Sequence, residues 1–305
     1  MVDFALLNEL SLPFNSYEES QNGFIEFFKV IKKLKKNNID KIRVDKEVKN
    51  FEILNSIYFP QYLGQIRDKE LRDRLRAFIT NRTILIDSPF VNDDEDGSGV
   101  LLENEYFYKN NSTQGVLAVA DIWDSILVSL NSNSSWNSAF IVVEKENISG
   151  YKESLNIRNI TVISHFDVHK DFFNRLHKFV LSDIKPTNFW EKRDTIFSNK
   201  VVFCDSIKDQ IKSIDYKIFK QAIMILQSIE NGVKRLDDLI ISGEGESVKT
   251  NPRLKSYREF MVDGEKEFFD KHIKNLPNGY RIYYLEKYNK LYIGYIGKHL
   301  PSKNF

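Results

Sequence analysis

Side chains that can transfer protons and bind phosphate gather near the carboxyl end of the sequence. The group contains two histidines, three cations and a tyrosine: His272, Lys274, Arg281, Tyr283, Lys298 and His299. Histidine suits proton transfer near neutral pH, because its unperturbed pKa is about 6.5. Cleavage of RNA without a metal needs a base for the 2′-OH, an acid for the 5′-oxygen and cations for the phosphate. These six residues are of the types that this chemistry requires.

The sequence predicts a role for each member of the group. We expect His272 or His299 to serve as acid and base and Arg281, with Lys298, to hold the phosphate. Nucleic-acid contacts are expected from three side chains: Lys274, Tyr283 and Lys298. A structural interpretation stays open, in which Arg281 pairs with Glu265 or Glu267 and the tyrosines pack on the sheet.

Two further histidines have the spacing of metal ligands. His165 and His169 are four residues apart, which would place both on one face of a helix, unless Asp167 is the N-cap and leaves His165 outside the helix. A metal-dependent enzyme is therefore a third hypothesis. The sequence offers no clear third ligand for the pair, so the prediction is that no metal and no other cofactor is bound.

Strand signals surround the six residues. Asp263-Gly264 separates two alternating runs, which is a strong signal for a two-residue hairpin turn. Together with the Tyr-rich runs that follow, this pattern predicts a four-stranded antiparallel meander over residues 257–262, 265–273, 280–286 and 291–299. The expected fold class is α+β, with a mixed helix and strand N-terminal body and this meander packed on helices.

The register of the last hairpin decides which side chains share a face. If Glu286 pairs with Leu291, then Tyr283 lies opposite Gly294, an arrangement in which the ring covers the missing side chain. On this register His299 points away from Tyr283, unless the strand ends before His299 and leaves it free of the alternation. Three residues share the other face: Arg281, Tyr283 and Lys298.

The last hairpin resembles the C-terminal strands of the RelE/ParE toxin superfamily. The resemblance covers about 45 residues and rests on GYRIYY at 279–284 and IGYIGKHL at 293–300, with His299 where the family commonly has arginine. It implies metal-independent RNA cleavage by basic side chains and a tyrosine or histidine on the sheet. The chain as a whole also looks like uncharacterised proteins of bacterial defence loci.

The charge distribution indicates two domains. Residues 253–305 contain eleven Lys and Arg against six Asp and Glu, although the whole chain has a net charge of only +1. A basic module on a mildly acidic body indicates an anionic partner. We expect a partner-docking α/β body over 1–200 and a RelE/ParE-like module over 201–305. The module is divided into helices at 206–236, a linker at 242–252 and the sheet at 257–299.

The N-terminal body mixes helices and strands at irregular intervals. Amphipathic helices are predicted at 20–36 and 68–80, and the apolar stretch at 115–130 is predicted to be one buried helix. The pattern lacks the regular alternation of a Rossmann domain, and no GxGxxG or P-loop motif occurs. Nucleotide-phosphate binding of these kinds is therefore not expected.

Composition favours a cytoplasmic protein. No apolar run approaches the roughly 18 residues that cross a bilayer, and the single cysteine, Cys204, cannot form an internal disulfide. We therefore expect no membrane association. Two functions are predicted: a toxin-like or anti-phage ribonuclease that binds RNA, or a non-enzymatic accessory subunit of a bacterial defence complex that binds a protein partner or nucleic acid.

Overall fold

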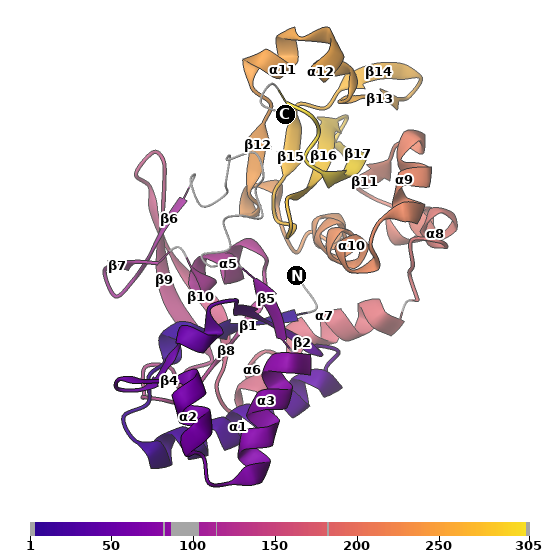
Figure 1. The fold of residues 1–305 in the computed structure, drawn as a ribbon. Helices are drawn as coiled ribbons and strands as arrows, with labels where there is room; N and C mark the ends of the chain where they lie inside the picture. Colours follow the sequence, from indigo (N-terminus) through magenta and orange to yellow (C-terminus); the bar gives the residue numbers. More distant parts are fainter. Residues whose placement is uncertain (1–3, 82, 87–103, 114, 182, 303–305) are drawn as a thin grey trace. The chain divides into compact units, whose positions relative to one another are not determined.

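The computed structural model describes residues 4–81, 83–86, 104–113, 115–181 and 183–302 (Figure 1). Its described residues divide into two compact units, 4–181 and 183–302. Each unit contains helices and β-sheet, so the expected α+β class is confirmed. Within these ranges, no helix is both long enough and apolar enough to cross a membrane.

An eight-stranded sheet forms the centre of the first unit. Its strands, in spatial order, are β5 (Thr83–Ile86), β2 (Lys41–Asp45), β1 (Phe4–Asn8), β8 (Ile126–Ser129), β10 (Lys152–Ile160), β9 (Phe140–Asn147), β6 (Asn104–Tyr108) and β7 (Asn111–Ser112). The first five are parallel and the remaining pairs antiparallel. The parallel strands follow the order of doubly wound α/β sheets, which was not expected from the sequence pattern.

Helices and one short hairpin complete the first unit. They are α1 (Tyr17–Lys36), α2 (Phe59–Gln65), α3 (Lys69–Asn81), α5 (Val116–Ile122), α6 (His165–Val168), α7 (Lys170–Leu181) and the hairpin of β3 (Glu52–Leu54) with β4 (Ile57–Tyr58). Helix α1 begins after Ser16, whose side chain accepts a hydrogen bond from the Glu19 N–H. It buries Phe24, Phe27, Val30 and Leu34, and both amphipathic helices lie near their predicted positions.

The expected helix at 115–130 is wrong. Helix α5 ends at Ile122, Asp124 adopts a positive φ of 48°, and strand β8 begins at Ile126. Both elements are almost completely buried. Because a buried strand and a buried helix are apolar on all sides, periodicity could not separate them.

A five-stranded sheet forms the centre of the second unit. Its strands, in spatial order, are β11 (Val201–Phe203), β17 (Lys290–Lys298), β16 (Tyr280–Lys287), β15 (Lys271–Ile273) and β12 (Ile241–Gly243). Strand β11 is parallel to β17, and the other pairs are antiparallel. Strands β13 (Glu259–Val262) and β14 (Glu265–Phe268) form the predicted Asp263-Gly264 hairpin, but as a separate two-stranded sheet.

The prediction of a four-stranded meander is therefore wrong about which strands form the sheet: β13 and β14 lie outside it, and β11 and β12 belong to it. The expected strand at 265–273 is interrupted at Phe269, whose buried ring packs 4.9 Å from that of Phe260 between centroids. Phe269 also belongs to a small core with Val262 and Cys204. This core holds the hairpin out of the main sheet, and β12 takes the place beside β15.

Helices pack on the five-stranded sheet and supply the unit's core. They are α8 (Phe189–Ile196), α9 (Lys208–Ser213), α10 (Tyr216–Glu230), α11 (Glu246–Thr250) and α12 (Pro252–Ser256). Helix α10 is buried on nearly all sides. At its end Glu230 accepts hydrogen bonds from the backbone N–H groups of Asn199, Lys200 and Val201, which fixes the start of β11. The expected linker at 242–252 is largely ordered as the end of β12, α11 and the start of α12.

Candidate functional site

Strand pairing brings predicted site residues together on one face of the five-stranded sheet. His272 of β15 lies directly opposite Tyr283 of β16, with ring centroids 4.9 Å apart. Arg281 lies two residues before Tyr283 and therefore points to the same face. His299 follows the last residue of β17, and its ring centroid is 5.3 Å from that of His272. The two histidines therefore lie in contact.

A β-bulge determines which face His299 occupies. Glu286 pairs with Leu291 as predicted, but Tyr284 pairs with Ile293 and Tyr283 with Tyr295. Gly294 is therefore the extra residue, and every later residue of β17 is shifted by one position. The expected pairing of Tyr283 with Gly294 is wrong for this reason.

The shift also exchanges the faces predicted for the last two site residues. Lys298 pairs with Tyr280 on the face opposite Tyr283, and His299 joins the face of His272. A side chain at position 294 would overlap the ring of Phe260, so only glycine fits where that ring packs. The aromatic residue that covers this glycine is thus Phe260 rather than Tyr283.

The structure does not place these side chains on an open concave surface. His272, Lys274, Arg281 and Tyr283 are all buried, with at most 2% of each residue exposed. His299 is half-buried and Lys298 is exposed. His272 and Arg281, both expected to contact substrate, are therefore buried, whereas His299 is partly exposed and Lys298 is exposed.

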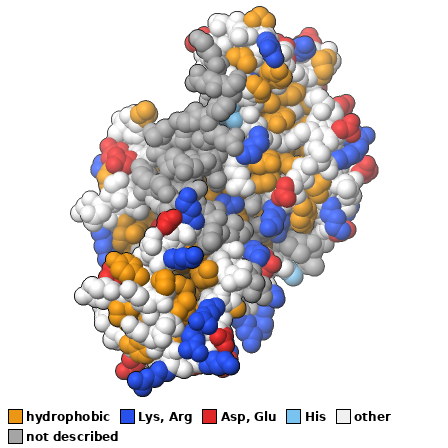
Figure 2. Space-filling model, in the orientation of Figure 1, with side chains coloured by type: hydrophobic (Ala, Val, Ile, Leu, Met, Phe, Trp, Pro, Cys, Tyr) orange, Lys and Arg blue, Asp and Glu red, His pale blue; other side chains and the backbone are white. Residues whose placement is uncertain are grey.

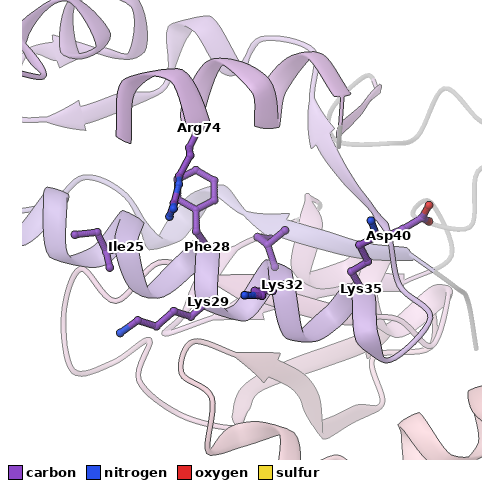
Figure 3. A pocket seen from close by; sticks show the side chains of 8 residues that line it. Ile25, Phe28, Lys29, Lys32, Lys35, Asp40 and Arg74 are labelled. Atoms are coloured by element: carbon purple, nitrogen blue, oxygen red, sulfur yellow. The ribbon is translucent and has the colours of Figure 1, made fainter. Parts of the chain in front are cut away.

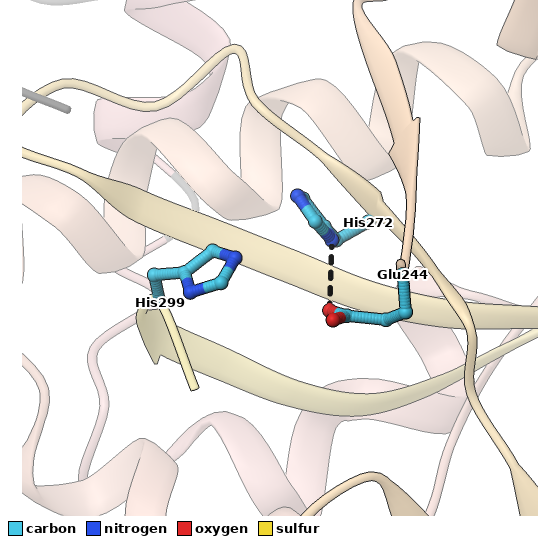
Figure 4. A group of neighbouring side chains, drawn as sticks. All are labelled: Glu244, His272 and His299. Atoms are coloured by element: carbon cyan, nitrogen blue, oxygen red, sulfur yellow. Dashed lines mark ion pairs between the residues drawn. The ribbon is translucent and has the colours of Figure 1, made fainter. Parts of the chain in front are cut away.

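Two residues absent from the predicted site lie at its centre. Glu244 follows β12, and its Oε1 lies 3.5 Å from His272 Nδ1 and 2.8 Å from Arg258 Nε (Figure 4). Arg258 is completely buried and donates hydrogen bonds to three backbone carbonyls, those of Leu254, Leu300 and Pro301. A buried carboxylate is therefore held between a guanidinium and an imidazole.

Burial and neighbouring charges shift the pKa values of Glu244 and Tyr283 in opposite directions. Burial alone would raise the pKa of Glu244, but contacts with His272 and Arg258 outweigh it and lower that pKa below its usual value. Burial and the nearby Glu244 carboxylate both raise the pKa of Tyr283, whose hydroxyl accepts a hydrogen bond from the Leu300 N–H at 3.2 Å. Glu244 is thus the anion of the group and Tyr283 its neutral member.

His272 has unused hydrogen-bonding capacity. Neither of its ring nitrogens has a hydrogen-bond partner within the described residues, although the residue is only 2% exposed. Glu244, His272 and His299 each offer one ligand atom, and these three atoms lie within 4.8 Å of one another. No other group of three such residues occurs among the side chains that the structure describes. The arrangement can support proton transfer or bind a cation.

The alternative histidine pair is used by the fold. His169 Nε2 lies 2.8 Å from the Ala139 carbonyl and 3.1 Å from that of Asn159. His165 Nδ1 accepts a hydrogen bond from the Thr161 N–H at 3.3 Å. The two imidazoles thus bind backbone groups of their own unit, and neither belongs to a three-ligand group among the described residues.

The glutamates that the structural interpretation assigned to Arg281 have another partner. Glu265 and Glu267 both pair with Lys287.

A separate groove lies in the first unit. It has a volume of about 450 Å³ and is lined by residues of α1 and α3 and the loop after α1: Ile25, Phe28, Lys29, Ile31, Lys32, Lys35, Asp40 and Arg74 (Figure 3). Figure 2 shows Lys and Arg side chains gathered on the surface over these helices. Two of the cations already pair within their own helices, Lys29 with Glu26 and Arg74 with Glu70. The groove therefore presents an apolar floor with a solvated, partly neutralised rim.

Sequence reasoning missed Glu244 because it lies in the expected linker at 242–252, and Arg258 because nothing in the expected strand at 257–262 marks it as buried. The signal that could have located them is the need of a buried histidine for a partner.

Comparison with protein-family models, curated proteins and solved structures finds no match to this chain.

Proposed function

We propose that the C-terminal sheet binds RNA and cleaves its phosphodiester backbone, with His299 as the group that exchanges protons with the substrate. The observation that carries the proposal is the contact of half-buried His299 with His272, whose imidazole lies beside buried Glu244. The basic composition of residues 253–305 and the resemblance to the RelE/ParE superfamily support RNA as the substrate. Such an activity fits a toxin-like or antiviral role in the bacterial cytoplasm.

The reaction needs only groups that this chain supplies. The 2′-oxygen attacks the adjacent phosphorus, so that the O2′–P bond forms as the P–O5′ bond breaks. The products are a 2′,3′-cyclic phosphate and a 5′-hydroxyl. His299 accepts the 2′-OH proton and, as the imidazolium so formed, gives it to the leaving 5′-oxygen, so that the reaction takes up no net proton. Arg281 and Lys274, on the same part of the sheet, contribute positive potential near the phosphate.

His272 acts in this proposal as a positioning residue. It is buried and packs between Tyr283 and His299, with centroid distances of 4.9 and 5.3 Å. Glu244 lies beside its Nδ1, which favours one orientation of the ring. Within the described residues no hydrogen bond joins the two imidazoles, so His272 restricts His299 through ring packing.

The test is cleavage of total RNA by the purified chain in the presence of EDTA. We expect fragments that end in a cyclic phosphate, and a loss of about 100-fold or more in rate for His299→Ala. The matched control is His177→Ala, because His177 is exposed on α7 in the other unit. Intact RNA with folded wild-type protein, or equal rates for His299→Ala and wild type, would contradict the proposal.

A separate measurement tests the role of His272. For His272→Gln we expect a lower kcat with little change in KM, because the residue does not contact substrate. A purely structural role would lower thermal stability without this split between kcat and KM.

The burial of the group favours a second candidate function. In an accessory subunit, the Glu244–Arg258 pair and His272 would hold the sheet together, and the module would bind a protein partner or nucleic acid without cutting it. This candidate predicts intact RNA together with loss of stability when Glu244 or Arg258 is changed. A protein partner would co-purify with the wild-type chain.

A further inference from the structure

We propose that Glu244, His272 and His299 bind one Zn²⁺ ion. Two imidazoles and one carboxylate form a known ligand set of zinc sites with three protein ligands. Glu244 directly follows β12, His272 lies in β15 and His299 directly follows β17, and the three side chains converge (Figure 4). Binding of a metal here goes beyond the proposed cleavage, which uses none.

The distances are close to those of a tetrahedral site. Bonds of about 2.1 Å place the ligand atoms of tetrahedral zinc roughly 3.4 Å apart. Glu244 Oε1 and His272 Nδ1 are already 3.5 Å apart, and no pair of ligand atoms in the group is separated by more than 4.8 Å. His299 lies beyond the end of β17 and is half-buried, so its side chain can close the remaining distance by a rotamer change.

A second observation points to a ligand at this place. His272 is 2% exposed, and neither ring nitrogen has a hydrogen-bond partner within the described part of the chain. Buried polar groups are nearly always satisfied, so a buried imidazole that makes no hydrogen bond among the described residues and lies 3.5 Å from a carboxylate oxygen calls for an explanation. A cation coordinated by one of these nitrogens supplies it.

The surrounding residues fit the outer shell of a metal site. Arg258 Nε lies 2.8 Å from Glu244 Oε1, and three backbone carbonyls fix its guanidinium. Metal-binding carboxylates are commonly held by hydrogen bonds from such outer partners. The ring of Tyr283 packs against His272 and restricts its rotation. These contacts fix the carboxylate and one imidazole before any metal arrives.

Zinc bound here would also regulate the proposed function. A nitrogen of His299 that coordinates zinc no longer carries or accepts a proton there, so the ion would inhibit RNA cleavage. This consequence rests on the proposed function, whereas zinc binding itself does not.

The experiment is titration of the full-length, metal-free chain with Zn²⁺, followed by calorimetry, and with Co²⁺, followed by its visible absorption. We expect one ion per chain and the intense bands of tetrahedral cobalt. His299→Ala should weaken binding about 100-fold or more, and Glu244→Gln should also weaken it. Circular dichroism checks that both variants fold, and His177→Ala is the matched control.

Each outcome decides the inference. Stoichiometric binding that is lost in His299→Ala and kept in His177→Ala supports it. Absence of saturable binding by the wild type, or equal binding by His299→Ala, overturns it. Because cleavage is measured in EDTA and zinc binding without RNA, failure of the proposed function and failure of the zinc site are told apart.

Discussion

The two sheets accommodate buried polar side chains in different ways. In the first unit, neutral side chains cross three adjacent strands: Asn8 donates to Ser129 at 2.9 Å, and Ser129 donates to Asn159 at 2.7 Å. Asn159 in turn donates to the carbonyls of Trp136 and Ser138. In the second unit, the buried polar group consists of charged and titratable side chains around Glu244.

The difference shows which of the two arrangements can act on a ligand. Amides and hydroxyls of the first unit hydrogen-bond one another and thereby fix how β1, β8 and β10 align, although Asn8 Oδ1 has no hydrogen-bond partner among the described residues. The group around Glu244 places a carboxylate against a guanidinium and leaves both nitrogens of His272 without a hydrogen-bond partner among the described residues. The first arrangement is built from neutral side chains, whereas the second contains titratable side chains that can exchange protons or hold a cation.

Two carboxylates extend the comparison. Burial and the charge of Asp45 raise the pKa of Glu9 from 4.5 to about 7, against hydrogen bonds from backbone N–H groups that include Val116. Glu244 is buried too, but His272 and Arg258 lower its pKa. A partner cation thus reverses the effect that burial has on a carboxyl group.

Arg258→Met should have the largest effect. The substitution leaves Glu244 buried without its cation, which costs about 3–5 kcal/mol of unfolding free energy. Chemical denaturation of the second unit measures the loss. The double variant Arg258→Met/Glu244→Gln should recover part of it, and Arg235→Met is the control because Arg235 is exposed and pairs with exposed Asp237. A loss below about 1 kcal/mol would show that the ion pair does not organise this unit.

The titration of Glu9 should have a smaller effect, in the first unit. Its folded-state pKa lies above the ordinary 4.5, so the folded protein binds the extra proton between pH 4.5 and about 7. The free energy of unfolding should therefore fall as pH rises through this window, by at most about 3 kcal/mol. Hydrogen exchange of the β1 amides follows the change. In Glu9→Gln the fall in unfolding free energy between pH 4.5 and about 7 should disappear. If the fall is unchanged in this variant, another titratable group causes it.

Asn159→Ala should have the smallest effect of the three. The change removes hydrogen bonds to two carbonyls and leaves Ser129 without its acceptor, at a cost of about 2 kcal/mol. Thermal unfolding of the first unit measures it, with exposed Asn131→Ala as the control. If Asn159→Ala is as costly as Arg258→Met, then charge is not what separates the two groups.

Local features of the sequence predicted local structure. The Asp263-Gly264 hairpin and the pairing of Glu286 with Leu291 follow from turn residues and alternation over a few positions. Helix α1 follows from its apolar stripe. The α+β class follows from the same signals summed along the chain.

Features that depend on distant contacts could not be predicted. The bulge at Gly294 depends on the ring of Phe260, which lies far away in the sequence. Glu244 belongs to the site because β12 pairs with β15, and no sequence motif predicts this pairing. Burial of His272 and Arg281 likewise depends on how the remaining chain covers the sheet.

Because Gly294 is an extra residue in β17, the number of residues in this strand determines which side chains meet at the site, as their identity does. Deletion of Gly294 would restore an uninterrupted ladder and exchange the sides on which Lys298 and His299 emerge. The chain would keep every imidazole, carboxylate and guanidinium that it has now. A single-codon deletion could therefore dismantle the cluster while the amino-acid composition stayed almost unchanged.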